Sequence, residues 1–125
     1  MQKQFDDNIP IYLQLIEKIK RLIVSGVLKP QDQMKSVREY ALEYGVNPNT
    51  VQRALSELER EGYVKSERTS GRFISMNQED IDRLKETMAQ EETEKYLDQM
   101  SQLGFDQNES VKHVSSYQKG NVTNE

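Results

Sequence analysis

The 125-residue sequence has no cysteine and only one histidine, His113. Without cysteine the chain can form neither a disulfide framework nor a thiolate metal site, and one histidine cannot by itself supply a metal cluster or a catalytic triad. No Gly-rich phosphate loop follows an expected strand, and the carboxylates fall at helix-surface spacings. We therefore expect no enzyme activity, no metal site and no cofactor, and a small hydrolase is the weakest of the function classes considered.

Long apolar runs are also missing. No stretch of about 18 apolar residues is present, which excludes a membrane-spanning helix. The first residues, Met1 to Asp7, lack the pattern of a signal peptide. At this length we expect one domain with an appendage, located in the cytoplasm.

Basic residues are in the minority, and the formal net charge is −4. The charges are unevenly distributed, because residues 1–76 carry twelve Lys and Arg against ten Asp and Glu, whereas residues 77–125 carry five against eleven. The first part is only mildly basic, well short of the strong charge that would indicate nucleic-acid binding by itself. Charge therefore permits a local basic patch without demonstrating one.

The middle of the chain is typical of two helices joined by a tight turn. Ser36 and Glu39 form the S-x-x-E pattern of a capping box, and Gly45 can end the first helix in the left-handed conformation. Asn47 is a good N-cap, and Pro48 follows where a missing N–H costs nothing. The second helix has an apolar stripe at helical spacing, formed by Val51, Ala54, Leu55 and Leu58.

This arrangement predicts a helix-turn-helix whose second helix reads DNA. Its remaining face carries polar side chains suited to base edges and phosphates: Asn49, Thr50, Gln52, Arg53 and Ser56. The alternative is a helical hairpin in which the same residues are solvated surface.

Elements on either side complete a winged-helix fold. A helix opening at Ile9-Pro10 and ending at Gly26 carries a core stripe of Tyr12, Leu15, Ile16, Ile19, Leu22 and Ile23. Residues 63–75 predict a two-stranded hairpin with a Gly-containing turn, which must pack against the helices because an isolated hairpin is marginal. Arg68 and Arg72 flank its tip and are placed to reach phosphates or a minor groove, or are simply solvated.

We expect three segments: a winged helix-turn-helix over residues 1–76, a two-helix region over residues 77–118, and a disordered tail over residues 119–125. The fold class is mostly α, an α+β winged helix with a short helical extension. The two-helix region has too few apolar residues for its own core, so it packs on the first domain or on a second copy of the chain. We favour a homodimer seam made by Leu84, Met88, Tyr96, Leu97, Met100, Leu103, Phe105, Val111 and Val114.

The order and spacing of many residues resemble the GntR family of bacterial transcription regulators. The resemblance covers about residues 9–75, and the short tail resembles the YtrA-type subfamily. The matching motifs are Pro10-Ile11-Tyr12, Ser36-Val37-Arg38-Glu39, Gly45-Val46-Asn47-Pro48-Asn49-Thr50-Val51, Arg53-Ala54-Leu55, Glu61-Gly62 and Gly71-x-Phe73. Three departures are Gln31 in place of the glycine after Pro30, Met34-Lys35 in place of Leu-Pro, and a wing that reads Thr69-Ser70-Gly71-Arg72 without the first of the two usual glycines.

The resemblance implies a homodimeric winged helix that binds double-stranded operator DNA. It implies DNA contacts by Arg38, by Asn47, Asn49, Thr50, Gln52 and Arg53, and by Gly71 in the wing. The neighbouring Lys35, Ser36, Arg68 and Arg72 complete the expected surface. Members of this subfamily often repress transport operons and their own genes, and their tails are too small to enclose an effector.

Two readings from different classes follow. The first is a sequence-specific repressor acting on an inverted-repeat operator. The second is a winged-helix protein-interaction module without DNA readout, which the acidic tail and thin basic patch favour. Salt-dependent binding to DNA distinguishes them.

Overall fold

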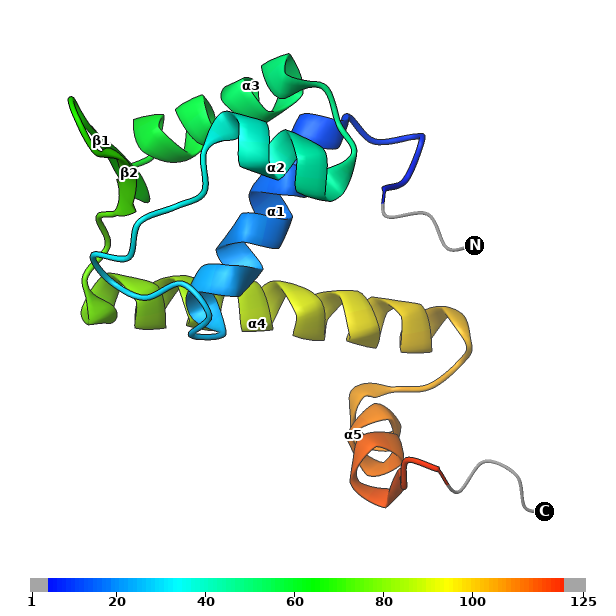
Figure 1. Cartoon of the computed structure of the whole chain (residues 1–125). Coiled ribbons are helices and arrows are strands. Elements are labelled where there is room, and N and C mark those ends of the chain that lie inside the picture. Colours follow the sequence, from blue (N-terminus) through cyan, green and yellow to red (C-terminus); the bar gives the residue numbers. More distant parts are fainter. Residues whose placement is uncertain (1–4, 121–125) are drawn as a thin grey trace. The chain divides into compact units, whose positions relative to one another are not determined.

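A computed structural model describes residues 5–120 of the chain. The elements in order are α1 (Ile11–Val24), α2 (Val37–Tyr44), α3 (Pro48–Arg60), β1 (Val64–Glu67), β2 (Gly71–Ile74), α4 (Gln78–Gln102) and α5 (Gln107–Ser116). The chain divides into two compact units at Lys85 and Glu86, and α4 contributes residues to both (Figure 1). No helix within the described part is long and apolar enough to cross a membrane.

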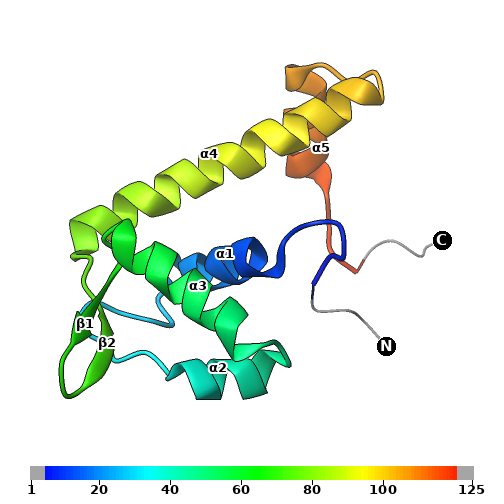
Figure 2. The same ribbon diagram turned by 90° about the horizontal axis from the view of Figure 1, so that it is seen from above.

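The first unit is a winged helix. Helices α1 and α2 pack on α3, and β1 lies against α3 (Figure 2). The buried core comes from every one of these elements and includes Leu15, Ile19, Ile23, Val51, Leu55, Leu58, Val64 and Ile74. The fold class predicted from the sequence, mostly helical with a small two-stranded sheet, is confirmed.

Both ends of α2 and the start of α3 form as the sequence predicted. At α2 the Ser36 hydroxyl accepts from the Glu39 N–H at 3.1 Å, and the Glu39 carboxylate accepts from the Ser36 N–H at 2.8 Å. Gly45 ends that helix with φ of 65°, and the Asn47 side chain accepts from the Asn49 N–H at 2.7 Å to open α3. These caps satisfy backbone groups that the turn would otherwise leave unpaired, so the angle between α2 and α3 is fixed locally.

The hairpin is supported by a third stretch of chain. Strands β1 and β2 are antiparallel, with Val64 opposite Ile74 and Glu67 opposite Gly71. Residues 31–34 run beside β2, where the Met34 N–H donates to the Arg72 carbonyl at 2.8 Å and the Ile74 N–H donates to the Asp32 carbonyl at 2.9 Å. The connector therefore covers the outer edge of β2, which the sequence pattern did not predict.

One departure from the family pattern has a direct structural meaning. Gln31 has φ of 73°, the left-handed region that glycine adopts at least cost, and it stands where the family has glycine. The connector needs this conformation to turn from α1 toward β2, since the Gln31 N–H donates to the Ile74 carbonyl at 3.0 Å.

The second unit contains the rest of α4 and the helix α5. Asp106 and Glu109 form a capping box at the start of α5. The Tyr96 hydroxyl donates to the Ser110 carbonyl at 2.8 Å, and the Phe105 and His113 rings meet edge to face at 5.0 Å. Only Met88 and Ser110 are buried among the described residues of this unit. Of the expected disordered tail, residues 121–125 lie outside the described residues.

The boundary predicted after residue 76 stays a prediction. Ile81 is buried in the core of the first unit and Leu84 packs against it, so the start of α4 belongs to that core. This core contact fixes the first two turns of α4 to the winged helix.

Candidate nucleic-acid interface

The surface of α3 is divided into two faces. Val51, Ala54 and Leu55 are fully buried on one face. The side chains at the start of the other face point outward: Asn49, Gln52, Arg53 and Ser56 are exposed and Thr50 is half-buried. This amphipathic division is the geometry a recognition helix needs, because the packed face fixes the orientation of the polar face.

Some polar side chains in and just before the start of α3 already have partners. The Asn47 side-chain oxygen is occupied by the cap, and the Gln52 amide donates to the Ser56 hydroxyl at 3.0 Å. An amide held by one hydrogen bond keeps a second N–H and its carbonyl oxygen for a base edge. The sequence placed these residues on one face; their contact with DNA stays a prediction.

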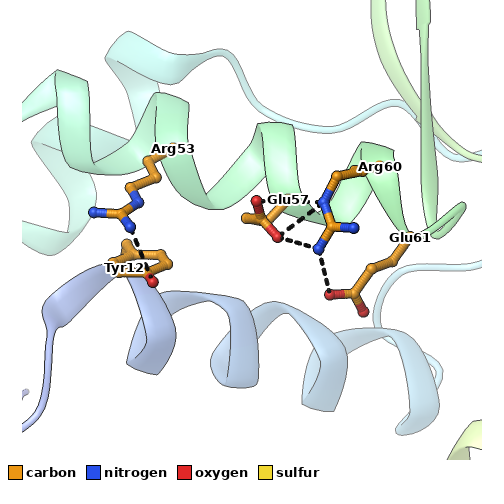
Figure 3. Close-up of polar contacts among 5 residues, drawn as sticks. All are labelled: Tyr12, Arg53, Glu57, Arg60 and Glu61. Carbon is orange, nitrogen blue, oxygen red and sulfur yellow. Dashed lines mark hydrogen bonds and ion pairs between the residues drawn. The ribbon is translucent and has the colours of Figure 1, made fainter.

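Arg53 is held by a residue of another helix. Its guanidinium carbon lies 3.7 Å from the centroid of the Tyr12 ring, and Nη2 donates to the Tyr12 hydroxyl at 3.2 Å (Figure 3). An open hollow beside this pair is lined by Ile11, Tyr12, Asn49, Thr50 and Arg53. The start of α1 therefore belongs to the same surface as the start of α3.

Sequence reasoning missed Tyr12 as part of this surface, because it assigned Tyr12 to the core stripe of the first helix. The side chain is in fact half-buried and packs on the core with only part of its ring. The one available signal was its place in the Pro10-Ile11-Tyr12 motif. Helical periodicity alone cannot tell a core tyrosine from one at the rim.

Around the start of α2, the predicted basic residues differ in their pairing. Lys35 makes an ion pair with Glu43, and that hydrogen bond raises the pKa of the Lys35 ammonium. Arg38 is exposed and makes no hydrogen bond or ion pair with any residue from 5 to 120. Ser36 uses its hydroxyl in the capping box, where the Ser36 N–H holds the pKa of Glu39 below its usual value.

The two wing arginines are not equivalent. Arg68 is exposed near the tip, whereas the Arg72 side chain is 19% exposed and its Nε lies 3.4 Å from the Glu59 carboxylate on α3. Glu59 also accepts from the Ser66 hydroxyl at 2.8 Å, and this bond is the main cause of its lowered pKa. Arg72 thus connects the wing to α3 through Glu59. A DNA phosphate would therefore have to share the Arg72 guanidinium with Glu59.

Gly71 lies where the wing crosses the connector. It has φ of 96°, and a Cβ there would come within 3.3 Å of the Gln33 amide nitrogen. The Gln33 amide also donates to the Ser70 carbonyl. Glycine is therefore required by the backbone of the turn itself.

The expected dimer residues fall into three groups by exposure. Leu84 packs on the core of the first unit and Met88 is buried, so these two are covered within one chain. Tyr96, Leu97, Met100 and Phe105 are half-buried. Leu103, Val111 and Val114 are exposed by 72%, 53% and 61%. Within this unit Tyr96, Met100, His113, Val114 and Tyr117 line a mainly apolar hollow.

Comparison with known proteins identifies the family. Residues 11–74, which contain the whole helix-turn-helix and wing, match the model described as bacterial regulatory proteins, gntR family. The chain belongs to the gntR family. It is 37% identical to the HTH-type transcriptional repressor YtrA of Bacillus subtilis over 128 aligned positions, which cover 94% of each protein.

Two solved structures are similar to this chain, and one of them is bound to operator DNA. A GntR family transcriptional regulator from Listeria monocytogenes is 34% identical, with a TM-score of 0.84 over 91% of this chain and all of that one. The DNA-binding domain of AraR in complex with operator ORX1 is 25% identical, with a TM-score of 0.53 over 60% of this chain and 92% of that one. Helix-turn-helix domains of this family bind operator DNA, and the present chain is a transcriptional regulator with such a domain, not an enzyme.

Proposed function

We propose that the protein is a homodimeric transcriptional repressor that binds an inverted-repeat operator through the outward face of α3. The observation that carries this proposal is the division of α3, whose buried stripe fixes the start of the helix and whose polar side chains there point outward. The chain's similarity to YtrA, which is described as a repressor, supports repression over activation.

The chemistry of the outward face suits base readout. Arg53 can donate two parallel hydrogen bonds to a guanine, and Asn49 and Gln52 can pair with an adenine edge. Arg38 and Arg68 are exposed cations on neighbouring elements and suit phosphates. The proposed surface also contains Lys35, Ser36, Asn47, Thr50, Gly71 and Arg72.

The second unit supports dimer formation. Leu103, Val111 and Val114 expose apolar surface that has no cover among the described residues of this unit. A second copy of the chain is the proposed cover, with Tyr96, Leu97 and Met100 beside them. Two linked readers gain affinity from high effective concentration, and a twofold dimer requires half-sites about 10 bp, or a multiple of that, apart.

Fluorescence anisotropy with the chain's own upstream region, and with promoters of transport operons, tests DNA binding. The Arg53→Ala variant should bind the operator about 1–3 kcal/mol more weakly and discriminate less against other sequences. The Lys35→Ala variant should weaken all sequences about equally and lower the salt dependence. Selection of bound DNA from a random pool then defines the operator.

Arg60→Ala is the matched control, because Arg60 lies on the same helix and is paired with Glu57 at 2.7 Å and Glu61 at 3.9 Å (Figure 3). It should bind like the parent. Equal binding by the parent, Arg53→Ala and Lys35→Ala would refute the proposed face. Absence of any salt-dependent binding would favour the protein-interaction module instead.

A further inference from the structure

Arg53 is oriented by an aromatic ring and not by an ion pair. Three other basic residues on or beside α3 pair with carboxylates: Lys35 with Glu43, Arg60 with Glu57, and Arg72 with Glu59. Arg53 makes no ion pair with residues 5–120 and rests instead on the neutral ring of Tyr12.

This difference matters for binding DNA. A cation paired with a carboxylate must give up or share that partner when it meets a phosphate or a base, and the loss offsets part of the new interaction. A ring face attracts the guanidinium through its quadrupole and leaves the full charge and most N–H donors directed elsewhere. The Tyr12 hydroxyl accepts one N–H from Nη2, so the second N–H of Nη2 and the N–H groups of Nε and Nη1 remain for the ligand.

We propose that Tyr12 is a positioning residue that preorganises Arg53 for sequence readout. The proposal rests on the DNA-reading role of Arg53 proposed above and adds a residue outside the helix-turn-helix to it. A free arginine loses rotamer freedom when it binds. The stack at 3.7 Å already restricts Arg53 in the folded protein, so less side-chain entropy is lost on binding DNA. Tyr12 is held in place because it packs on the core and comes from α1, which packs against α3.

The experiment is a double-mutant cycle on operator binding with Tyr12→Leu and Arg53→Ala, and with Tyr12→Phe as the conservative variant. Tyr12→Leu should weaken binding to the selected operator about three- to tenfold, with binding to a random duplex and the salt slope unchanged. Tyr12→Phe keeps the ring and loses the hydroxyl, so it should fall between parent and Tyr12→Leu. In the Arg53→Ala background, Tyr12→Leu should change affinity less than twofold.

Tyr63→Leu is the matched control, since Lys20 Nζ lies over the Tyr63 ring at 5.0 Å and Tyr63 is also half-buried against the core. The Tyr63→Leu variant loses a cation–π contact within the same unit. It should leave the ratio of operator affinity to random-duplex affinity unchanged. Thermal unfolding of each variant separates a loss of folded protein from a loss of readout.

Two outcomes would overturn the proposal. If Tyr12→Leu weakens binding equally with and without Arg53, Tyr12 acts on DNA independently or only through folding. If operator and random duplex weaken together, orientation of Arg53 is not the mechanism. A failure of the proposed function is distinguishable, because Arg53→Ala alone would then leave operator binding unchanged.

Discussion

The two compact units differ in how much of their apolar surface they bury within one chain. In the first unit, apolar side chains from α1, α2, α3, both strands and the start of α4 close a core within one chain. In the second unit, most described apolar side chains remain exposed or half-buried, and Val114 is 61% exposed. A self-contained core is what a rigid reader of DNA needs. An open apolar surface is what a self-associating segment needs.

Substitution in the core should give the largest effect. Leu55 is fully buried, so Leu55→Ala should lower the free energy of unfolding of the first unit by about 2–5 kcal/mol through lost burial and a cavity. Leu42→Ala is the matched control, because Leu42 is 76% exposed and its truncation should cost little. Chemical denaturation followed by circular dichroism measures both. Equal losses would contradict the described core.

A charge in the second unit should break the proposed dimer without unfolding the winged helix. Val114→Glu should weaken self-association by about 2 kcal/mol or more per protomer, because a buried valine contributes about 1.5–3 kcal/mol and an unpaired carboxylate costs more. Analytical ultracentrifugation should show monomers, and circular dichroism should show unchanged helicity. Val27→Glu is the control, since Val27 is 64% exposed in the first unit. A dimer unaffected by Val114→Glu would place the seam elsewhere.

The left-handed residue in the connector offers a smaller, stabilising change. Gln31→Gly should raise the unfolding free energy of the first unit by up to about 1 kcal/mol, because relief of the strained φ outweighs the extra freedom of glycine when unfolded. Gln31→Ala retains the strain and should give no gain. A stabilising alanine variant, or a destabilising glycine variant, would argue against strain at this position.

The smallest expected effect is on acid stability. The folded pKa of Glu39 lies below its unfolded value, chiefly because the Ser36 N–H donates to its carboxylate. Its contribution is therefore present above about pH 4.5 and is lost as the pH falls through the folded pKa. Glu39→Gln should flatten the decline in stability of the first unit below pH 4.5, measured by denaturation at several pH values. An unchanged slope would contradict this role.

Local chemistry made the helix-turn-helix predictable from the sequence. Ser36 with Glu39, Gly45, and Asn47 before Pro48 act over a few residues, so their spacing alone indicated both helix ends. The hairpin was likewise predictable from β-forming residues around Gly71.

The missed features are contacts between segments far apart in the chain. Tyr12 meets Arg53 across 41 positions, and Glu59 ties Arg72 to α3 across 13. Residues 31–34 cover β2 although no strand periodicity marks them. Periodicity assigns a side chain to a face, but only the packed fold shows which neighbour that face meets.

In the proposed complex, two copies of the chain present two α3 surfaces to one duplex. Sedimentation of the complex with a selected inverted-repeat operator, compared with the same DNA carrying one half-site, tests it most directly. We expect two chains per duplex on the inverted repeat, and clearly weaker binding when one half-site is removed. Saturation at one chain per inverted repeat, with equal affinity for the half-site, would contradict it.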